Sequence, residues 1–261
     1  MACLPVTLIL MPFQVIAVAI GGRAAHIVPR FYHRLLCRIV GLEVRVEGTI
    51  SPDRPTLFVA NHVSYTDIVA FSSVLDASFV AKAEIADWPL FGLLARLNRA
   101  VFVRRQGRHA GQQRDEIRLR LEAGDNIILF PEGTSHDGQR VLPFKSALFS
   151  AVEGMAGGGR LTVQPVSVAY TRLDGIPLRR VFRPQYAWYG DMELMPHLLE
   201  MMGSGTVQIQ LTFHDPVAID RFPTRKALAD FCFRTIVAGV DSANSGRPPP
   251  GVSAASAPAK S

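Results

Sequence analysis

From Leu42 to residue 240 the chain alternates short apolar runs with longer segments in which apolar residues recur every three or four positions. Short runs of this kind are typical of buried strands, and the longer segments are typical of helices packed against them. The pattern predicts strands over residues 43–47, 56–60, 78–81, 100–103, 126–130, 162–169 and 206–213. It predicts helices over residues 65–75, 86–97, 110–123, 145–155 and 224–239. This alternation predicts an α/β domain with a mixed, largely parallel central sheet flanked by helices.

The N-terminal 42 residues follow a different pattern. No charged residue occurs from Met1 to Gly22, and a helix of that length just crosses a hydrocarbon core of about 30 Å, although Pro5 and Pro12 argue against a straight span. Over residues 27–42 basic and large apolar residues each recur every four positions: Arg30, Arg34 and Arg38, and Phe31, Leu35 and Ile39. Two such stripes are typical of a helix at an anionic membrane interface, and equally of a surface helix in a soluble domain. Beside the uncharged run, membrane docking is favoured.

Composition supports an acidic partner. The net charge is +6, and arginine supplies 24 of the 28 basic residues. Arginine suits forked contacts with phosphate, but no basic block interleaved with aromatic residues predicts nucleic-acid binding, so an anionic membrane surface is the expected partner. The arginines after the apolar run favour the cytoplasmic face of the inner membrane.

The C-terminal stretch is rich in Pro, Ser and Ala and predicts a disordered tail. The expected organisation is therefore an N-terminal membrane-docking segment, a central domain and a tail, with boundaries at 1–42, 43–240 and 241–261.

A histidine and a carboxylate follow the second predicted strand. His62 comes two residues after TLFVA (56–60), and Asp67 lies five residues further on. An imidazole can take a proton from an alcohol, and a carboxylate on its other nitrogen fixes the tautomer. Ser64 to Asp67 also matches a helix capping box. In this alternative interpretation Asp67 stabilises a helix start and has no part in catalysis. The two interpretations are compatible, because a capped helix start is a rigid platform for the histidine just before it.

Other kinds of catalysis lack their sequence signals. The chain has no G-x-S-x-G elbow and no cysteine near these residues, so a covalent acyl-enzyme has no candidate nucleophile. The histidines show no HExxH or similar spacing, and we expect neither a metal ion nor another cofactor. What remains is a His–Asp base acting on a hydroxyl of the substrate, with arginines nearby for an anionic group.

Polar residues also follow two further strands. Arg104 and Arg105 come after AVFV, and Pro131-Glu132-Gly133-Thr134 comes after NIILF. In open α/β sheets, ligands bind outside the carboxyl ends of the strands. Each motif alone is explained equally well by a turn or a solvated surface arginine, whereas their joint order favours a site.

Taken together, these blocks resemble those of the glycerolipid acyltransferase family, which includes the 1-acyl-sn-glycerol-3-phosphate acyltransferases. The resemblance covers most of residues 40–215. It rests on five stretches in the order of the family: NHVSYTD (61–67), KAEIADWPLFGLLARLNRAVFVRR (82–105), LFPEGTSHDG (129–138), LPFKSALF (142–149) and VQPVSVAY (163–170).

The resemblance implies roles for individual residues. His62 would deprotonate the free hydroxyl of a lysophospholipid, oriented by Asp67, and the alkoxide would attack the thioester of acyl-CoA or acyl-carrier protein. Arg105 would hold the substrate phosphate, with Arg104 beside it. Four further residues match blocks that are expected to bind substrate: Glu132, Gly133, Thr134 and Lys145.

Two positions depart from the family pattern. Members that make phosphatidate usually have Arg after E-G-T and Gly two residues after the lysine, where this chain has Ser135 and Ala147. The stretch AWYGDMELMPHL (187–198) resembles bacterial relatives that acylate lyso-ornithine lipid, whose headgroup carries a carboxylate and an amine in place of phosphate.

We therefore expect an O-acyltransferase that converts 1-acyl-sn-glycerol-3-phosphate to phosphatidate, with lyso-ornithine lipid as the alternative acceptor. A hydrolase and a non-catalytic lipid-binding scaffold share the fold and are the alternatives from other classes.

Overall fold

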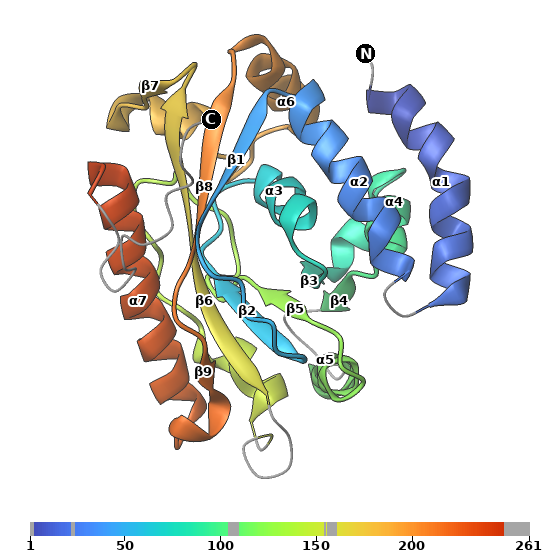
Figure 1. Ribbon diagram of the computed structural model, residues 1–261, viewed down its shortest axis with the longest axis vertical. Coiled ribbons are helices and arrows are strands. Elements are labelled where there is room, and N and C mark those ends of the chain that lie inside the picture. Colours follow the sequence, from blue (N-terminus) through green and yellow to red (C-terminus); the bar gives the residue numbers. More distant parts are fainter. Residues whose placement is uncertain (1–2, 22–23, 104–109, 154, 156–160, 248–261) are drawn as a thin grey trace.

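The computed structural model describes residues 3–21, 24–103, 110–153, 155 and 161–247. Its centre is a single sheet (Figure 1). The strands are β1 (Leu42–Gly48), β2 (Thr56–Ala60), β3 (Ser78–Lys82), β4 (Val101–Val103), β5 (Ile127–Leu129), β6 (Thr162–Leu173), β7 (Ile176–Pro177), β8 (Val207–Phe213) and β9 (Val217–Ala218).

The sheet has the order β1-β8-β6-β2-β5-β3-β4, with β7 and β9 paired to β6. The β1/β8, β2/β6, β2/β5, β3/β5 and β3/β4 pairs are parallel, whereas β6 is antiparallel to β8, β7 and β9. The predicted mixed, largely parallel sheet is confirmed. The parallel β2 and β5 bring the loops after both strands to the same edge of the sheet.

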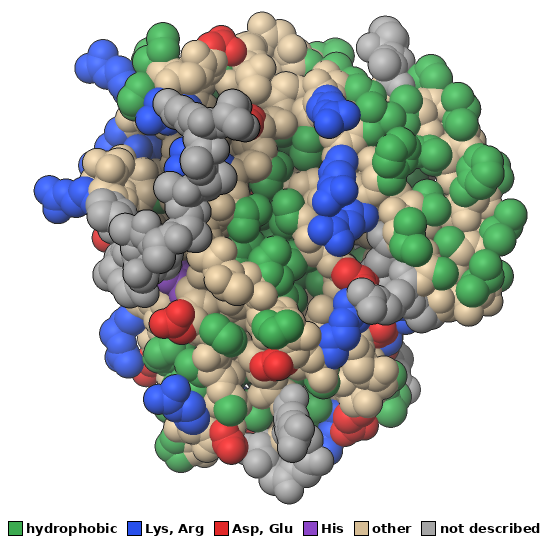
Figure 2. All heavy atoms as spheres, in the orientation of Figure 1, with side chains coloured by type: hydrophobic (Ala, Val, Ile, Leu, Met, Phe, Trp, Pro, Cys, Tyr) green, Lys and Arg blue, Asp and Glu red, His purple; other side chains and the backbone are tan. Residues whose placement is uncertain are grey.

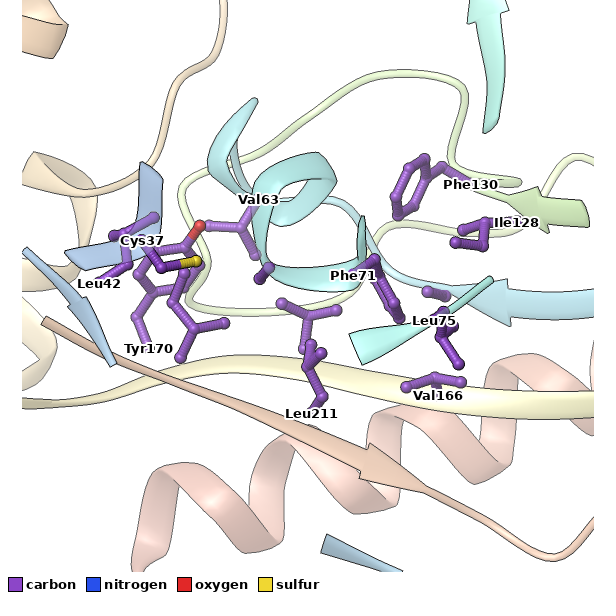
Figure 3. Packing of buried hydrophobic residues seen from close by; sticks show 14 of the residues in the cluster. Cys37, Leu42, Val63, Phe71, Leu75, Ile128, Phe130, Val166, Tyr170 and Leu211 are labelled. Atoms are coloured by element: carbon purple, nitrogen blue, oxygen red, sulfur yellow. The ribbon is translucent and has the colours of Figure 1, made fainter. Parts of the chain in front are cut away.

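Helices cover both faces of this sheet (Figure 1). The α-helices are α1 (Cys3–Ile20), α2 (Ala24–Ile39), α3 (Thr66–Val74), α4 (Phe91–Leu97), α5 (Ala110–Glu122), α6 (Leu194–Gly203) and α7 (Arg225–Ser245). One buried apolar cluster joins the sheet to α2, α3 and α6, and it includes Phe71, Phe130 and Tyr170 (Figure 3). A second lies on the opposite face, where α5 and α7 pack.

Several predicted boundaries are wrong. Residues 86–97 are not one helix: a 3-10 helix, η1 (Ala83–Asp87), precedes α4, because Pro89 lacks an amide hydrogen and disfavours helical backbone in the residue before it. Residues 145–155 contain a 3-10 helix, η2 (Ser146–Val152), in place of an α-helix. The last helix continues five residues into the predicted tail and ends at Ser245, and the φ of 69° at the next residue, Gly246, suits a left-handed cap.

The first two helices form a hairpin against the domain. Gln14 joins three helices, because its Nε2 donates to the carbonyls of Ala25 (2.9 Å) and Leu97 (2.6 Å). The Arg34 Nε donates to the Ser73 carbonyl of α3 at 2.9 Å. Although it contains Pro12, α1 is continuous, and it is long and apolar enough to cross a membrane by length and composition.

The outer side of α1 is apolar and exposed. Figure 2 shows hydrophobic side chains gathered over this helix and a row of Lys and Arg side chains beside it, over α2. The exposed large hydrophobic residues of α1 are Leu4, Leu8, Ile9, Phe13, Val15, Ile16 and Ile20. Because large contiguous apolar surfaces are rare on soluble monomers, this one marks an interaction surface.

Candidate active site

The site begins where β2 ends. All five residues of this strand are buried, and Asn61 follows them. The Asn61 side chain donates to the Val168 carbonyl (2.9 Å) and accepts from the Val168 amide (2.8 Å). These two bonds fasten the end of β2 to β6 and fix the position of His62, the next residue.

His62 and Asp67 form the predicted pair. The Nδ1 of His62 lies 2.8 Å from the Oδ2 of Asp67, whose side chain is fully buried, whereas the His62 side chain is 19% exposed. The same Oδ2 accepts the amides of Val63 (2.6 Å) and Ser64 (3.0 Å). The carboxylate therefore holds the proton on Nδ1 and leaves Nε2 to accept one from a substrate. Through these two amides Asp67 also ties down the backbone before α3, as the helix-start interpretation expects, and its catalytic role stays a prediction.

A tyrosine completes the contacts of Asp67. The Tyr170 hydroxyl, reaching from β6, donates to Asp67 Oδ1 at 2.8 Å and lies 2.6 Å from Thr66 Oγ1. Figure 3 shows its ring pointing toward the loop that carries Val63. Burial, and then the nearby Asp67 charge, raise the pKa of Tyr170 well above its ordinary value, so the hydroxyl remains a donor. The sequence alone does not indicate this role, because Tyr170 resembles any other core position of a buried strand.

The loop after β5 supports the histidine from a second side. The Phe130 ring stacks on the His62 ring with centroids 4.3 Å apart. Glu132, only 2% exposed, accepts the amide of His62 on Oε1 and the amide of Leu142 on Oε2, both at 2.8 Å. Burial raises its pKa to about 7, although the two backbone amides oppose that shift. In this position Glu132 fixes the backbone of His62. Its contact with substrate stays a prediction.

The other predicted substrate-binding residues lie on or near the same loop. Gly133 has a φ of 70° and donates to the Phe130 carbonyl at 3.0 Å, which makes the tight turn that glycine permits. Thr134 is half-buried, and the Lys145 side chain is exposed while its amide donates to Pro131. Their contacts with substrate stay predictions. Arg104 and Arg105 lie outside the described residues.

An apolar cavity of about 310 Å³ opens beside His62. It lies between α1, α2, α3 and α4, and its walls include Met11, Leu36, Val69, Phe91 and Leu94. The volume and lining fit the apolar part of a small ligand. The arrangement can therefore place an apolar chain next to the His62 imidazole. Among the residues that the structure describes, no three His, Cys, Asp or Glu side chains gather as a metal site would require.

Comparisons with known proteins identify the family of the chain. A family model described as "Acyltransferase" matches residues 42–169. A lyso-ornithine lipid O-acyltransferase of Brucella abortus is 42% identical over 250 residues, covering 94% of each chain. Another, from Rhizobium meliloti, is 42% identical over 228 residues, covering 86% of this chain and 78% of that protein. A 1-acyl-sn-glycerol-3-phosphate acyltransferase of Neisseria gonorrhoeae is 37% identical over 155 residues, covering 58% of this chain and 56% of that protein.

The fold has a solved counterpart. The crystal structure of the 1-acyl-sn-glycerophosphate acyltransferase PlsC from Thermotoga maritima has a TM-score of 0.56 to this chain, covers 82% of it with 80% of its own length, and is 24% identical. This likeness shows the shared fold, and the more similar sequence relatives show the family. The chain belongs to the acyltransferase family that includes the 1-acyl-sn-glycerol-3-phosphate acyltransferases, and it is an O-acyltransferase of lysolipids.

Proposed function

We propose that this protein transfers an acyl chain from an acyl thioester to the free hydroxyl of lyso-ornithine lipid, with His62 as the general base. The observation that carries the proposal is the His62–Asp67 pair at the mouth of an apolar cavity. The acceptor is supported by the relatives from Brucella and Rhizobium, which are similar over most of the chain. Ser135, where phosphatidate-forming members usually have Arg, supports the same acceptor, because it removes a cation that a phosphate would need.

The chemistry follows from the geometry of the pair. The Nε2 of His62 takes the proton of the acceptor hydroxyl while the oxygen attacks the thioester carbonyl carbon. Asp67 stabilises the imidazolium that forms. When the tetrahedral intermediate collapses, the carbon–sulfur bond breaks, the new ester remains on the lipid, and His62 returns its proton to the leaving thiolate. No acyl-enzyme is needed in this sequence.

Two features around the pair support this choice of substrates. The cavity walls accept an acyl chain, and the exposed apolar face of α1 beside the arginines of α2 supports docking on an anionic membrane. We expect the cytoplasmic face of the inner membrane, where the positive-inside tendency puts Arg30, Arg34 and Arg38. Acyl-CoA and acyl-carrier protein both remain candidate donors.

Phosphatidate synthesis is the second candidate. The Neisseria relatives that carry this activity in their names are 37% identical, but they cover only 58% of the chain. Because of this similarity, a test of the acceptor should include 1-acyl-sn-glycerol-3-phosphate.

The deciding experiment measures acyl transfer by membranes that contain the protein. Labelled acyl-CoA and acyl-carrier protein are offered in turn with lyso-ornithine lipid or lysophosphatidic acid, and membranes with the His62→Ala variant serve as the control. We expect product with lyso-ornithine lipid that is lost in the variant. Product with lysophosphatidic acid alone would select phosphatidate synthesis, and acyl-CoA consumption without any acceptor would indicate a hydrolase.

A further inference from the structure

A short loop after the E-G-T block is held directly against the catalytic loop. The His136 amide donates to the His62 carbonyl at 3.1 Å. Two residues later, Gly138 has a φ of 70°, and a Cβ at this position would lie 2.9 Å from Val63 Cγ1. Glycine therefore permits both the turn and the close approach. As a result, Asp137, which lies between these two attachments, is held near the reacting histidine.

A second segment closes on the same place. The Trp188 amide donates to the Val63 carbonyl at 3.0 Å. Next to it, the Tyr189 ring lies against the His136 ring with centroids 6.2 Å apart. Three parts of the chain that are distant in sequence thus meet around Val63.

The charges at this junction have both signs. The Asp137 side chain is 25% exposed. Its Oδ1 accepts the Gln139 amide at 3.0 Å and lies 2.6 Å from the His136 Nδ1. Among the residues that the structure describes, Oδ2 of Asp137 has no hydrogen-bond partner. From a 3-10 helix after β7, the Arg180 Nε donates to Gln139 Oε1 on this loop at 2.7 Å, and Arg140 on the loop is exposed.

Resting on the proposed function, we propose that Asp137 binds the ammonium group of the acceptor lipid. Its open oxygen gives a charge-assisted hydrogen bond to a primary ammonium, and the Tyr189 ring offers an aromatic face to the same cation. Arg180 supplies the opposite charge for a carboxylate on the same headgroup. A phosphomonoester carries no cation and would be repelled by Asp137. This loop therefore selects a zwitterionic headgroup over a purely anionic one.

The first test changes only the lipid. Purified protein in detergent acylates lyso-ornithine lipid or the same lipid with its amine acetylated, and kcat and KM are measured for each. We expect the acetylated lipid to have a KM about tenfold higher or more, because a hydrogen bond between two charged groups is lost. Equal KM values would overturn the proposal without any question of folding.

The second test changes the protein. Asp137→Asn keeps the size of the side chain and an acceptor for the Gln139 amide, while Asp230→Asn changes an exposed acid on α7 as the matched control. We expect Asp137→Asn to raise the KM for lyso-ornithine lipid by about the same factor as acetylation, and to leave the KM of the acetylated lipid unchanged. A variant that still distinguishes the two lipids as the unmodified protein does would overturn the assignment to Asp137.

The two hypotheses fail in different ways. If the unmodified protein acylates lysophosphatidic acid but not lyso-ornithine lipid, both the proposed acceptor and the ammonium site are wrong. If it acylates lyso-ornithine lipid with no sensitivity to the amine or to Asp137, the acceptor stands and only the ammonium site is wrong.

Discussion

Two histidines lie at the carboxyl ends of strands in this sheet, each with a polar partner, but their partners and their burial differ. His62 follows β2 and lies 2.8 Å from Asp67, beside an apolar cavity. His214 follows β8, and its Nε2 lies 2.7 Å from the Ser167 hydroxyl. Taken by distance alone, the second pair has the composition of a nucleophile and its base.

The buried pair is arranged for structure. The Ser167 hydroxyl donates to the Ile236 carbonyl of α7 at 3.0 Å, so it accepts the proton of His214 Nε2 and has none left to give. Gly239 closes α7 over the pair, because a Cβ there would lie 2.2 Å from Ser167 Oγ. Burial lowers the pKa of His214 to about 4. The comparison shows that a carboxylate partner and an open face, more than proximity to a hydroxyl, distinguish the proposed base from the structural histidine.

The largest expected effect separates the two regions by activity. His62→Ala should lower kcat by about 10²–10⁴-fold, the usual contribution of a positioned general base. Ser167→Ala should leave kcat per folded molecule unchanged and destabilise the protein by about 1–3 kcal/mol, because His214 loses its buried acceptor. Turnover by both variants, normalised to folded protein by circular dichroism, checks this. A folded but inactive Ser167→Ala variant would break the comparison.

A second effect separates the two regions by pH. The pKa of His214 is about 4 in the folded protein and near 6.5 when unfolded, so the unfolded chain binds a proton that the folded chain refuses. Stability from this histidine is complete above the unfolded value and falls as the pH drops toward 4. Between about pH 7.5 and about pH 5 the loss should be about 2 kcal/mol of unfolding free energy.

Other buried groups require a matched variant for this measurement. The raised pKa of Glu132 gives the opposite slope, since the stability that this carboxyl contributes to the protein is lost as the pH rises through about 7. Burial lowers the pKa of His33 to about 4, so His33 adds to the slope that His214 gives. Urea unfolding of the unmodified protein and of His214→Phe at both pH values isolates the one histidine. The idea of a neutral, structural His214 fails if the two proteins lose stability equally.

Local patterns predicted the central fold because each strand carries its own signal. The apolar run TLFVA became β2 with the predicted bounds, and the alternation of elements was enough to predict the mainly parallel sheet. The misses are elements whose stability comes from tertiary contacts. The helix α6 was not predicted, and β7 and β9 are two-residue strands that exist only through pairing with β6.

The site shows the same difference between features that local sequence predicts and features that depend on tertiary contacts. His62 and Asp67 were predictable since they lie five residues apart and follow a strand end. Tyr170 is 103 residues from Asp67, and only the pairing of β6 beside β2 brings its hydroxyl to the carboxylate. Glu132 was predicted as part of the site, whereas its hold on the His62 amide depends on the parallel pairing of β2 and β5.

The smallest effect tests whether Tyr170 contributes to catalysis through Asp67. Tyr170→Phe removes the only side-chain hydroxyl that donates to Asp67 Oδ1 among the described residues, and it retains the ring that packs in the core. A less firmly held carboxylate orients His62 less well, so we expect kcat to fall about tenfold, equivalent to about 1.4 kcal/mol. The KM for the lysolipid should stay unchanged, because Tyr170 is buried away from solvent and acts on the base rather than on the substrate.

Tyr186→Phe provides the matched control. Tyr186 is 1% exposed against 3% for Tyr170, and both belong to the same apolar cluster, but Tyr186 makes no hydrogen bond to the His62–Asp67 pair among the described residues. Thr66→Val removes a second partner of the Tyr170 hydroxyl and leaves the bond to Asp67 in place. Steady-state kinetics should therefore show a kcat defect in Tyr170→Phe alone. Equal defects in Tyr170→Phe and Tyr186→Phe would mean that any loosening of this core slows the reaction, and that the tyrosine is not a positioning residue for the base.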